Sequence, residues 1–576
     1  MKNKFKYTLL VIFAFVTSII IYEYIEVNKP VVSLDNILTV QENLEKNIFD
    51  NTKNYTLENP KIILNPYGNS PLTALVIFET KDLTTPVVTI KGKDGAKDIT
   101  NTFTPSKIHI LPIYGLYAGY NNTITVKASG ISKTINIKTD NLPSDFIKIT
   151  DINKNLNTDE FYFTTPEDKG YTAAYDENGD VRWYLIGDYK WEVQRLNNGH
   201  LLISNDKLVN SPYYTKGLME IDLLGKIYYQ YDIPSGYHHS AIEMSNGNFL
   251  VASNNFKDGS VEDYIVEIDR NSGDVVKEWN LHKLQNNNKE NWLGLSSLLY
   301  NKNNSITFTG KNNDMISNID YKSGEINWII ADKKNVPKKY YKYILNGDLT
   351  LNNPTSLNAL SNGDIAFINT KDDNIYLTIC HIDIDNKSYS VVSETKLGKN
   401  VDASIKVDDE NNYILTGDNY IKEVNNDDTL TITTDSSKLY NTEKMSLYAN
   451  DIYTSGAGVK LGKIGITPTS KNVSTLFHKN GKNIIKKYNL KFVKESDRLV
   501  FTGTFNSNDD VKLILDNFLT KRTYDIVISN TPYSHNKDKG KITVSKYINN
   551  EDIYGKFYIY IRINGVNYKL EKYVIF

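Results

Sequence analysis

The chain has 576 residues, and its 66 lysines and arginines almost balance its 68 aspartates and glutamates. The formal net charge of −2 gives no overall basic field, which argues against nucleic acid as a partner. Apolar residues make up 40% of the chain and Cys380 is its single cysteine, so the composition predicts a folded protein and excludes both an intramolecular disulfide framework and a multi-cysteine zinc site.

Residues 1–30 predict a membrane anchor. Three lysines in "MKNKFK" precede the uncharged run from Tyr7 to Tyr22. At about 1.5 Å per residue this run is shorter than a hydrocarbon core of about 30 Å, unless flanking groups snorkel. No A-x-A-like cleavage site follows it, which favours an uncleaved single-pass signal anchor over a cleaved signal peptide and secretion. In either case the bulk of the chain is expected to be extracytoplasmic.

Two segments follow the anchor. Residues 31–57 have helix-like apolar spacing and are interpreted as a short spacer. Residues 58–143 alternate apolar and polar positions between turns of Gly, Asn and Pro, as in "NPKIILNPYGNSPLTALVIFETKD" and "TITVKASGISKTINIKTDNLP". Such a pattern predicts a small N-terminal β-sandwich.

Residues 144–452 contain a repeat. One half of the repeat is a strand, a turn and a second strand, as in "AYDENGDVRWYLIG", "EIDRNSGDVVKEWNL" and "NIDYKSGEINWIIAD". The other half is a hairpin around an Asn-rich turn, often Asn-Gly, as in "HHSAIEMSNGNFLVASNN" and "NPTSLNALSNGDIAFINTKD". Four strands per copy and about six copies predict a six-bladed β-propeller.

Residues 453–576 predict an additional C-terminal β domain of unknown role. Their alternation around Asn564-Gly565 is typical of a hairpin, and they carry no recognisable chemistry. The fold class predicted for the whole chain is therefore all-β, with a propeller between two smaller β domains.

The repeat gives the adjacent histidines of "GYHHSAIEMSNGN" a position in the fold. Counting back seven residues from the Asn of each Asn-Gly turn defines one slot, which holds His239, Thr355 and Trp191 in three copies. Equivalent slots on successive blades face the same region, so His239 is expected to line the central channel. His238, one residue earlier on a strand, is expected to point outward.

The sandwich and the propeller resemble the bacterial arylsulfotransferase family. In the sandwich, the resemblance rests on "NPYGNSPLTALVIFETKD", "VTIKGKDGAKDITNTF" and "HILPIYGLYAGYNN". In the propeller, it rests on "ENGDVRWYL", "HHSAIEMSNGN" and "YKSGEINWIIAD", and altogether it covers about residues 58 to 450.

The resemblance implies sulfuryl transfer from an aryl sulfate to a phenol without a nucleotide sulfate donor. In this family a channel histidine attacks sulfur, while other histidines, an asparagine and an arginine stabilise the developing charge. A neutral imidazole is a good nucleophile near pH 7, and a planar guanidinium matches two sulfuryl oxygens. The resemblance implies no cofactor, and we expect no metal site, because the Asp/Asn runs lack calcium-loop spacing.

Several family positions differ in this chain. His239 matches the first channel histidine of the family, although Ser240 follows where Asp is usual. The nucleophile motif, Gln-His before an Asn-Gly turn, has become "NNPTSLNALSNG", which places Thr355 in the histidine slot. A threonine hydroxyl needs a base, and its sulfate ester would be a stable dead end.

The charge-stabilising positions also differ. The family motif "DWxHxNS" appears as "NWLGLSS", in which Trp292 remains, Gly294 replaces the histidine and Ser296 replaces the asparagine. The strand that carries the family's arginine appears as "FTGKNND", which leaves Lys311. The candidate residues are thus His239 for catalysis, with Lys311, Ser296, Thr355 and Trp292 for substrate binding.

Two functions follow from these observations. The chain is either a working arylsulfotransferase that takes a small-molecule aryl sulfate and a phenol, with His239 as a candidate nucleophile, or a catalytically degenerate, membrane-anchored propeller. The second would bind aromatic, sulfated or glycan ligands without turnover. The residues alone place the second slightly ahead because the nucleophile slot holds Thr355, and they do not determine the oligomeric state.

Overall fold

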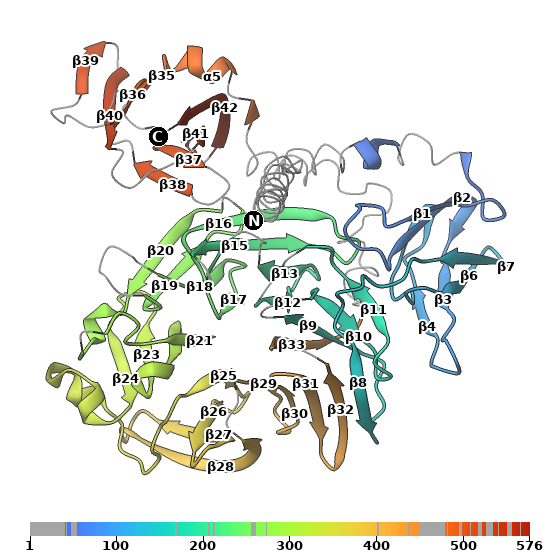
Figure 1. Cartoon of the computed structure of the whole chain (residues 1–576), viewed down its shortest axis with the longest axis horizontal. Coiled ribbons are helices and arrows are strands. Elements are labelled where there is room, and N and C mark those ends of the chain that lie inside the picture. Colours follow the sequence, from blue (N-terminus) through green and yellow to red (C-terminus); the bar gives the residue numbers. More distant parts are fainter. Residues whose placement is uncertain are drawn as a thin grey trace, which may run out of the picture.

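The chain is described by a computed structural model that is built almost entirely of strands (Figure 1). The described residues are 41, 43–47, 54–166, 170–187, 189, 191–204, 208–210, 214–254, 261–271, 273–287, 289–399, 402–435, 438–448, 479–480, 482–494, 498–506, 509–516, 521–525, 534–538, 541–549, 556–564 and 566–575. The all-β prediction is confirmed. The predicted anchor, residues 1–30, lies outside the described residues, and among those that are described no helix is long and apolar enough to cross a membrane.

Two small sheets form the N-terminal sandwich. One has the order β1 (Lys61–Leu64), β2 (Ala74–Thr84), β5 (Ser106–Ile113), and the other has the order β4 (Ile99–Thr102), β3 (Val87–Ile90), β6 (Asn121–Ala128), β7 (Ile131–Lys138). In β6 every second side chain is buried, because successive side chains of a strand point to opposite faces. The alternation in the sequence therefore predicted this domain correctly.

Six sheets follow within the described part of residues 149–445, and Figure 1 shows them arranged around a common centre as in a β-propeller. In chain order they contain β9 (Phe161–Pro166), β10 (Ala173–Tyr175), β11 (Val181–Tyr184) with β33 (Leu439–Met445); β12 (Val193–Arg195), β13 (Leu201–Ser204), β14 (Leu208–Asn210), β15 (Tyr214–Ile221), β16 (Ile227–Tyr237); β17 (Ala241–Glu243), β18 (Phe249–Ser253), β19 (Tyr264–Ile268), β20 (Val275–Asn280); β21 (Leu295–Asn301), β22 (Ser305–Gly310), β23 (Met315–Asp320), β24 (Ile326–Ile330); β25 (Thr355–Ala359), β26 (Ile365–Lys371), β27 (Asn374–Asp383), β28 (Ser388–Lys399); and β29 (Ser404–Val407), β30 (Tyr413–Thr416), β31 (Tyr420–Asn425), β32 (Asp428–Thr434), β8 (Ile149–Lys154). Short 3₁₀ turns are η3 (His282–Leu284), η4 (Lys311–Asn313), η5 (Lys333–Asn335) and η6 (Lys338–Tyr343).

The two ends of the propeller sequence close the ring by strand exchange. The late strand β33 pairs antiparallel with the early strand β9, in a register that sets Thr442 opposite Thr164. The early strand β8 pairs with the late strand β32 in the same way. Each exchange covers an edge strand whose backbone groups would otherwise lack partners. The exchange also places β33 beside β12 and β29, among the first strands of the other sheets.

Apolar cores lie between neighbouring sheets, and one of them extends into the sandwich. Arg182 on β11 fixes this domain contact. Its guanidinium forms an ion pair with Asp176 at 2.9 Å, donates to the Gly115 carbonyl at 2.6 Å and lies 3.7 Å from the centre of the Tyr117 ring. Arg182 is only 2% exposed, so the sandwich and the propeller share buried structure.

The spacer also contacts the propeller. Residues 43–47 are helical, in agreement with the helix-like spacing of the sequence. Gln41 exchanges two hydrogen bonds with the backbone of Ile227, and Glu45 forms a buried ion pair with Lys226 at 2.5 Å. The helical segment is therefore docked against β16 through buried polar contacts.

The C-terminal region forms two further sheets around its own apolar core. Its elements are β34 (Lys479–Asn480), α5 (Lys482–Lys487), β35 (Lys491–Lys494), β36 (Arg498–Asn506), β37 (Val511–Asp516), β38 (Lys521–Asp525), β39 (Ser534–Asp538), β40 (Lys541–Asn549), β41 (Lys556–Ile563) and β42 (Val566–Ile575). Strands β41 and β42 pair antiparallel, as the sequence around Asn564 predicted. An ion pair between Arg562 and Asp274 links the domain to the propeller.

Candidate functional site

The turn that enters β17 holds His239 in a left-handed backbone conformation. His239 has φ of 56°, and Trp191, which occupies the same slot before β12, has φ of 69°. Backbone hydrogen bonds between His238 and Ala252 and between Ser240 and Ala252 fasten this turn to β18. Non-glycine residues seldom adopt positive φ, so the conformation shared by these two residues reflects their equivalent position before the first strand of their sheets.

The imidazole of His239 lies between a carboxylate and a phenol. Its Nε2 is 3.7 Å from Oε1 of Glu262, and its Nδ1 is 2.9 Å from the hydroxyl of Tyr440. The same hydroxyl donates to the carbonyl of His239 at 3.2 Å. About a third of the His239 side chain is exposed (35%), so a small molecule can reach the ring.

Glu262 is the buried acid of this group. It lies in the loop between β18 and β19, is 8% exposed, has φ of 53° and donates its backbone N–H to Oδ1 of Asn254 at 2.6 Å. Burial acts to raise its pKa, but its contacts with His239, His238 and Asn291 prevail and lower the pKa to about 2. The carboxylate is therefore ionised at neutral pH.

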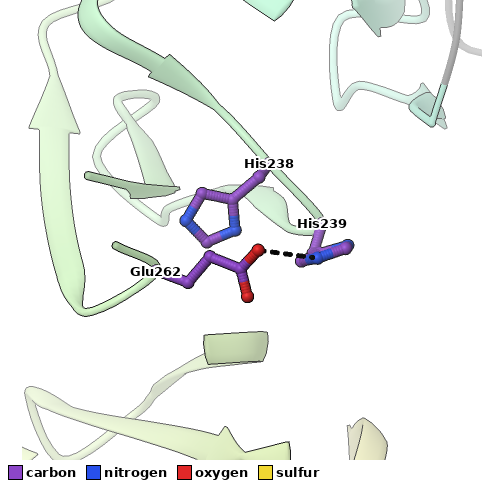
Figure 2. Close-up of side chains that lie close together, drawn as sticks. All are labelled: His238, His239 and Glu262. Atoms are coloured by element: carbon purple, nitrogen blue, oxygen red, sulfur yellow. Dashed lines mark ion pairs between the residues drawn. The ribbon is translucent and has the colours of Figure 1, made fainter. Parts of the chain in front are cut away.

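His238 belongs to the same cluster, although its side chain is fully buried (Figure 2). Its Nε2 is 3.0 Å from the carbonyl of Ser253, a distance at which the ring N–H donates to that oxygen. Burial lowers the pKa of His238 to about 4, so the ring is neutral at pH 7. The ring centroids of His238 and His239 are 5.2 Å apart and nearly perpendicular. His238 thus lies inside the blade and not on the outer surface.

Lys311 belongs to a cluster of three charged side chains that come from three different segments of the propeller. Its Nζ is 2.8 Å from Asp402, whose other oxygen is 3.1 Å from Nζ of Lys438. Burial acts to raise the pKa of Asp402, but the hydrogen bonds and charges of the two lysines lower it to about 2. The cluster carries a net positive charge, and Lys438 is only two residues before Tyr440, which contacts His239.

The other predicted substrate residues have structural contacts. Thr355, half-buried, is the first residue of β25, and no described acid or histidine hydrogen-bonds its hydroxyl. Ser296 lies 2.9 Å from the hydroxyl of Thr309 and 3.4 Å from the carbonyl of Pro354, which precedes Thr355. Ser296 is therefore held near the entrance to β25, where Thr355 stands.

Trp292 is a core residue in this structure. Its ring is fully buried, and its Nε1 donates to Asp263 at 2.8 Å. Asp263 directly follows Glu262, so Trp292 supports the loop that carries the carboxylate and offers no surface to a ligand. Gly294 has φ of +60°, and a Cβ there would lie 2.8 Å from the Asn312 side chain, so a histidine at this position requires both backbone strain and movement of Asn312.

Sequence reasoning missed Glu262, Tyr440, Asp402 and Lys438, because none belongs to the quoted motifs. A pocket of about 1010 Å³ lies elsewhere, between residues 93–97 of the sandwich and residues 157–160, 177, 178 and 180 of the propeller. None of the predicted site residues lines it. That His239, Lys311, Ser296 and Thr355 serve a common substrate stays a prediction.

Comparison with known proteins supports the resemblance. The family model "Arylsulfotransferase (ASST)" matches residues 147–455, and "Arylsulfotransferase Ig-like domain" matches residues 61–140. The arylsulfate sulfotransferase AssT of Lelliottia amnigena is 24% identical over 40% of this chain and 50% of that protein. AssT of Escherichia coli O6:H1 (strain CFT073) is 26% identical with the same coverage. The chain thus matches about half the length of these curated relatives.

Solved structures add little to this result. A streptogramin B lyase structure is 15% identical, covers 53% of this chain and 89% of that chain, and has a TM-score of 0.31. Virginiamycin B lyase from Staphylococcus aureus is 14% identical, covers 69% of this chain and 99% of that chain, and has a TM-score of 0.30. The first of the two family models alone spans more than half of the sequence, and on that match the chain belongs to the arylsulfotransferase family.

Proposed function

We propose that this protein transfers a sulfuryl group from an aryl sulfate to a phenol and that His239 is its nucleophile. Family membership supports the reaction class, and AssT is the name of the curated relatives. One observation carries the choice of residue. His239 is a partly exposed imidazole held between an ionised carboxylate and a phenolic hydroxyl, whereas Thr355, in the family's nucleophile slot, has no described base beside its hydroxyl.

The contacts of His239 assign a role to each ring nitrogen. Nε2 faces Glu262, so that nitrogen carries the proton, and Nδ1 keeps the lone pair. Nδ1 attacks sulfur, an N–S bond forms, and the S–O bond to the aryl group breaks with its electron pair leaving on the phenolate oxygen. The ring becomes cationic in this step, and the carboxylate of Glu262 stabilises that charge, as the acid of a catalytic triad does.

We assign proton transfer to the leaving group to Tyr440. Its hydroxyl lies 2.9 Å from Nδ1, the attacking atom, and a phenol has a pKa close to that of the phenolate that departs. Tyr440 can donate its proton to the leaving oxygen. An acceptor phenol that returns a proton to Tyr440 then attacks sulfur and regenerates the imidazole.

The Lys311–Asp402–Lys438 cluster supplies the positive charge. The sulfuryl group carries negative oxygens in every state of the reaction, and two ammonium groups share one carboxylate here. Lys438 directly precedes β33, the strand whose Tyr440 contacts His239. The two lysines replace the family's arginine with weaker, non-planar donors, so a slower reaction is expected.

A chromogenic aryl sulfate with added phenol tests the proposal. The full chain should release phenolate and form the new aryl sulfate, and His239→Gln should abolish both. His381→Gln is the matched control, because His381 also pairs with a carboxylate (Asp364, 2.7 Å) but lies on β27, the third strand of its sheet. Rapid acid-labile labelling at His239 is expected on the natural chain. Absence of turnover in the natural chain, with retained binding of aryl sulfate, would show the degenerate binding protein instead.

We also propose that residues 1–30 anchor the protein with its propeller outside the cytoplasm. The support is the uncharged run from Tyr7 to Tyr22 after three lysines. Protease added to intact cells should digest the propeller and leave the N-terminal segment in the membrane. Recovery of the full chain in the cytosol would contradict this.

A further inference from the structure

Three metal-binding groups converge behind the proposed nucleophile. Each of His238, His239 and Glu262 offers one nitrogen or oxygen atom, and these atoms all lie within 4.8 Å of one another (Figure 2). They come from two separate segments, the turn before β17 and the loop before β19. We propose that these three residues bind a divalent transition-metal ion, with zinc as the preferred occupant.

The contacts of His238 prepare it as a ligand. Its Nε2–H is held by the carbonyl of Ser253 at 3.0 Å, which leaves Nδ1 with the lone pair. The hydroxyl of Ser253 in turn donates to the carbonyl of Gly236 at 2.8 Å. A backbone acceptor on the second ring nitrogen is the usual outer-shell support of a metal-binding histidine, because it fixes the tautomer and the orientation of the ring.

Glu262 presents a negative charge to this pair from a buried position. Its Oε1 is 3.7 Å from Nε2 of His239, and its donor oxygen lies within 4.8 Å of the donor atoms of both imidazoles. Buried carboxylates normally pair with a cation or bind a metal. A divalent ion would satisfy this carboxylate and both imidazole lone pairs together.

Backbone strain marks the same place. Both His239 and Glu262 have positive φ values, 56° and 53°, although neither is a glycine. Such conformations cost about 1–3 kcal/mol each and concentrate at functional sites. Figure 2 shows the two side chains of these residues facing each other, with Nε2 of His239 3.7 Å from Glu262.

The donor set selects the class of metal. Two imidazoles and one carboxylate, with a fourth position left open, form a common zinc arrangement, and hard ions such as calcium and magnesium prefer oxygen ligands only. Zinc ligands lie about 2.0–2.2 Å from the metal, so the three donors must close by about an ångström. The exposed side of His239 leaves room for a water molecule as the fourth ligand.

Metal binding and nucleophilic attack exclude each other on His239. A metal on Nε2 moves the ring proton to Nδ1 and removes the lone pair that attacks sulfur. Zinc should therefore inhibit sulfuryl transfer reversibly. The site itself goes beyond the proposed function, because binding can be measured whether or not the protein turns over.

The experiment is a titration of the chelator-treated full chain with Co²⁺ and Zn²⁺. We expect one Co²⁺ per chain with the visible absorption of a four- or five-coordinate N/O site, and its displacement by Zn²⁺. Glu262→Gln, which keeps size and shape, and His239→Gln, at a partly exposed position, should each weaken Zn²⁺ binding by at least about 10–100-fold. His238→Ala should do the same, and circular dichroism and thermal melting identify any variant that fails to fold.

His381→Ala is the control. It removes a histidine that pairs with a carboxylate, Asp364, outside the proposed metal site, and should leave the Zn²⁺ affinity unchanged. No stoichiometric binding to the natural chain would overturn the proposal, as would equal affinity in folded Glu262→Gln and His239→Gln variants. Absence of transfer by the metal-free natural chain, with Zn²⁺ binding intact, would refute the proposed function and leave the metal site standing.

Discussion

Glu262→Gln should slow sulfuryl transfer without weakening substrate binding. The substitution keeps the size of the side chain and removes the charge that faces Nε2 of His239 at 3.7 Å. At an effective dielectric constant of about 20, two unit charges at that separation attract by about 4 kcal/mol. Because a third of the His239 side chain is exposed, solvent reduces this to about 1.4–2.8 kcal/mol, which corresponds to a loss of about 10–100-fold in rate.

The assay should separate kcat from KM. The cation on His239 develops only as sulfur is attacked, so the loss of Glu262 should fall on kcat and leave KM nearly unchanged. Phenolate release is measured at saturating and at low aryl sulfate, with a chelator present so that bound metal does not contribute. The pKa of Glu262 is lowered to about 2, so its carboxylate stays ionised between pH 8 and about pH 4. The natural enzyme should therefore keep the full contribution of this charge to kcat over that range.

A matched substitution controls for loss of charge. Asp364→Asn removes a carboxylate from another histidine–carboxylate pair, after the turn at the far end of β25. It should leave kcat within about twofold of the natural chain. An unchanged kcat in Glu262→Gln, or an effect confined to KM, would refute the argument that this carboxylate stabilises a cationic His239.

Three further outcomes follow from buried groups. Arg182→Met should lower the free energy of unfolding by about 3–5 kcal/mol, measured in denaturant, because it leaves Asp176 charged and buried; an effect under 1 kcal/mol would contradict a fixed domain contact. Burial raises the pKa of Glu192 from 4.5 to about 7, so the folded state holds this proton more tightly than the unfolded state between those values. The free energy of unfolding should therefore fall by up to about 3 kcal/mol as pH rises from 4.5 to 7, and Glu192→Gln should remove that component of the pH dependence. Thr355→His should raise phenolate release by less than about tenfold, since no described carboxylate is hydrogen-bonded at that position; full activity there would show that the family's site is intact.

The propeller could be predicted because its signals are local. Each repeat carries its own Asn-Gly hairpin, and hairpin pairing depends on residues only a few positions apart. The slot also has a local structural signature: His239 and Trp191 share a left-handed conformation because each stands at the same step before the first strand of its sheet. In the third copy the position differs by one residue: the positive φ falls on Ser356 and not on Thr355.

The partners of His239 could not be predicted from local patterns. Tyr440 lies 201 positions from His239, and Glu262 stands in a loop with no motif. A slot rule says which way a residue points and gives no information about what another blade places opposite. Trp292 shows the converse, since its place in a motif suggested substrate contact while the fold uses it as a buried support.

Ring closure and completion of the site depend on the same strand. Tyr440 reaches His239 only because β33 leaves the end of the propeller sequence and pairs with β9, and Lys438 enters the charge cluster at the start of that strand. A chain that folded its blades without this exchange would keep His239 and Glu262 but would lack the phenol and one of the two cations. Closure is the most non-local pairing in the propeller, and such contacts form late because they close the longest loop. We therefore expect the His238–His239–Glu262 cluster to form before the proposed transfer site is complete.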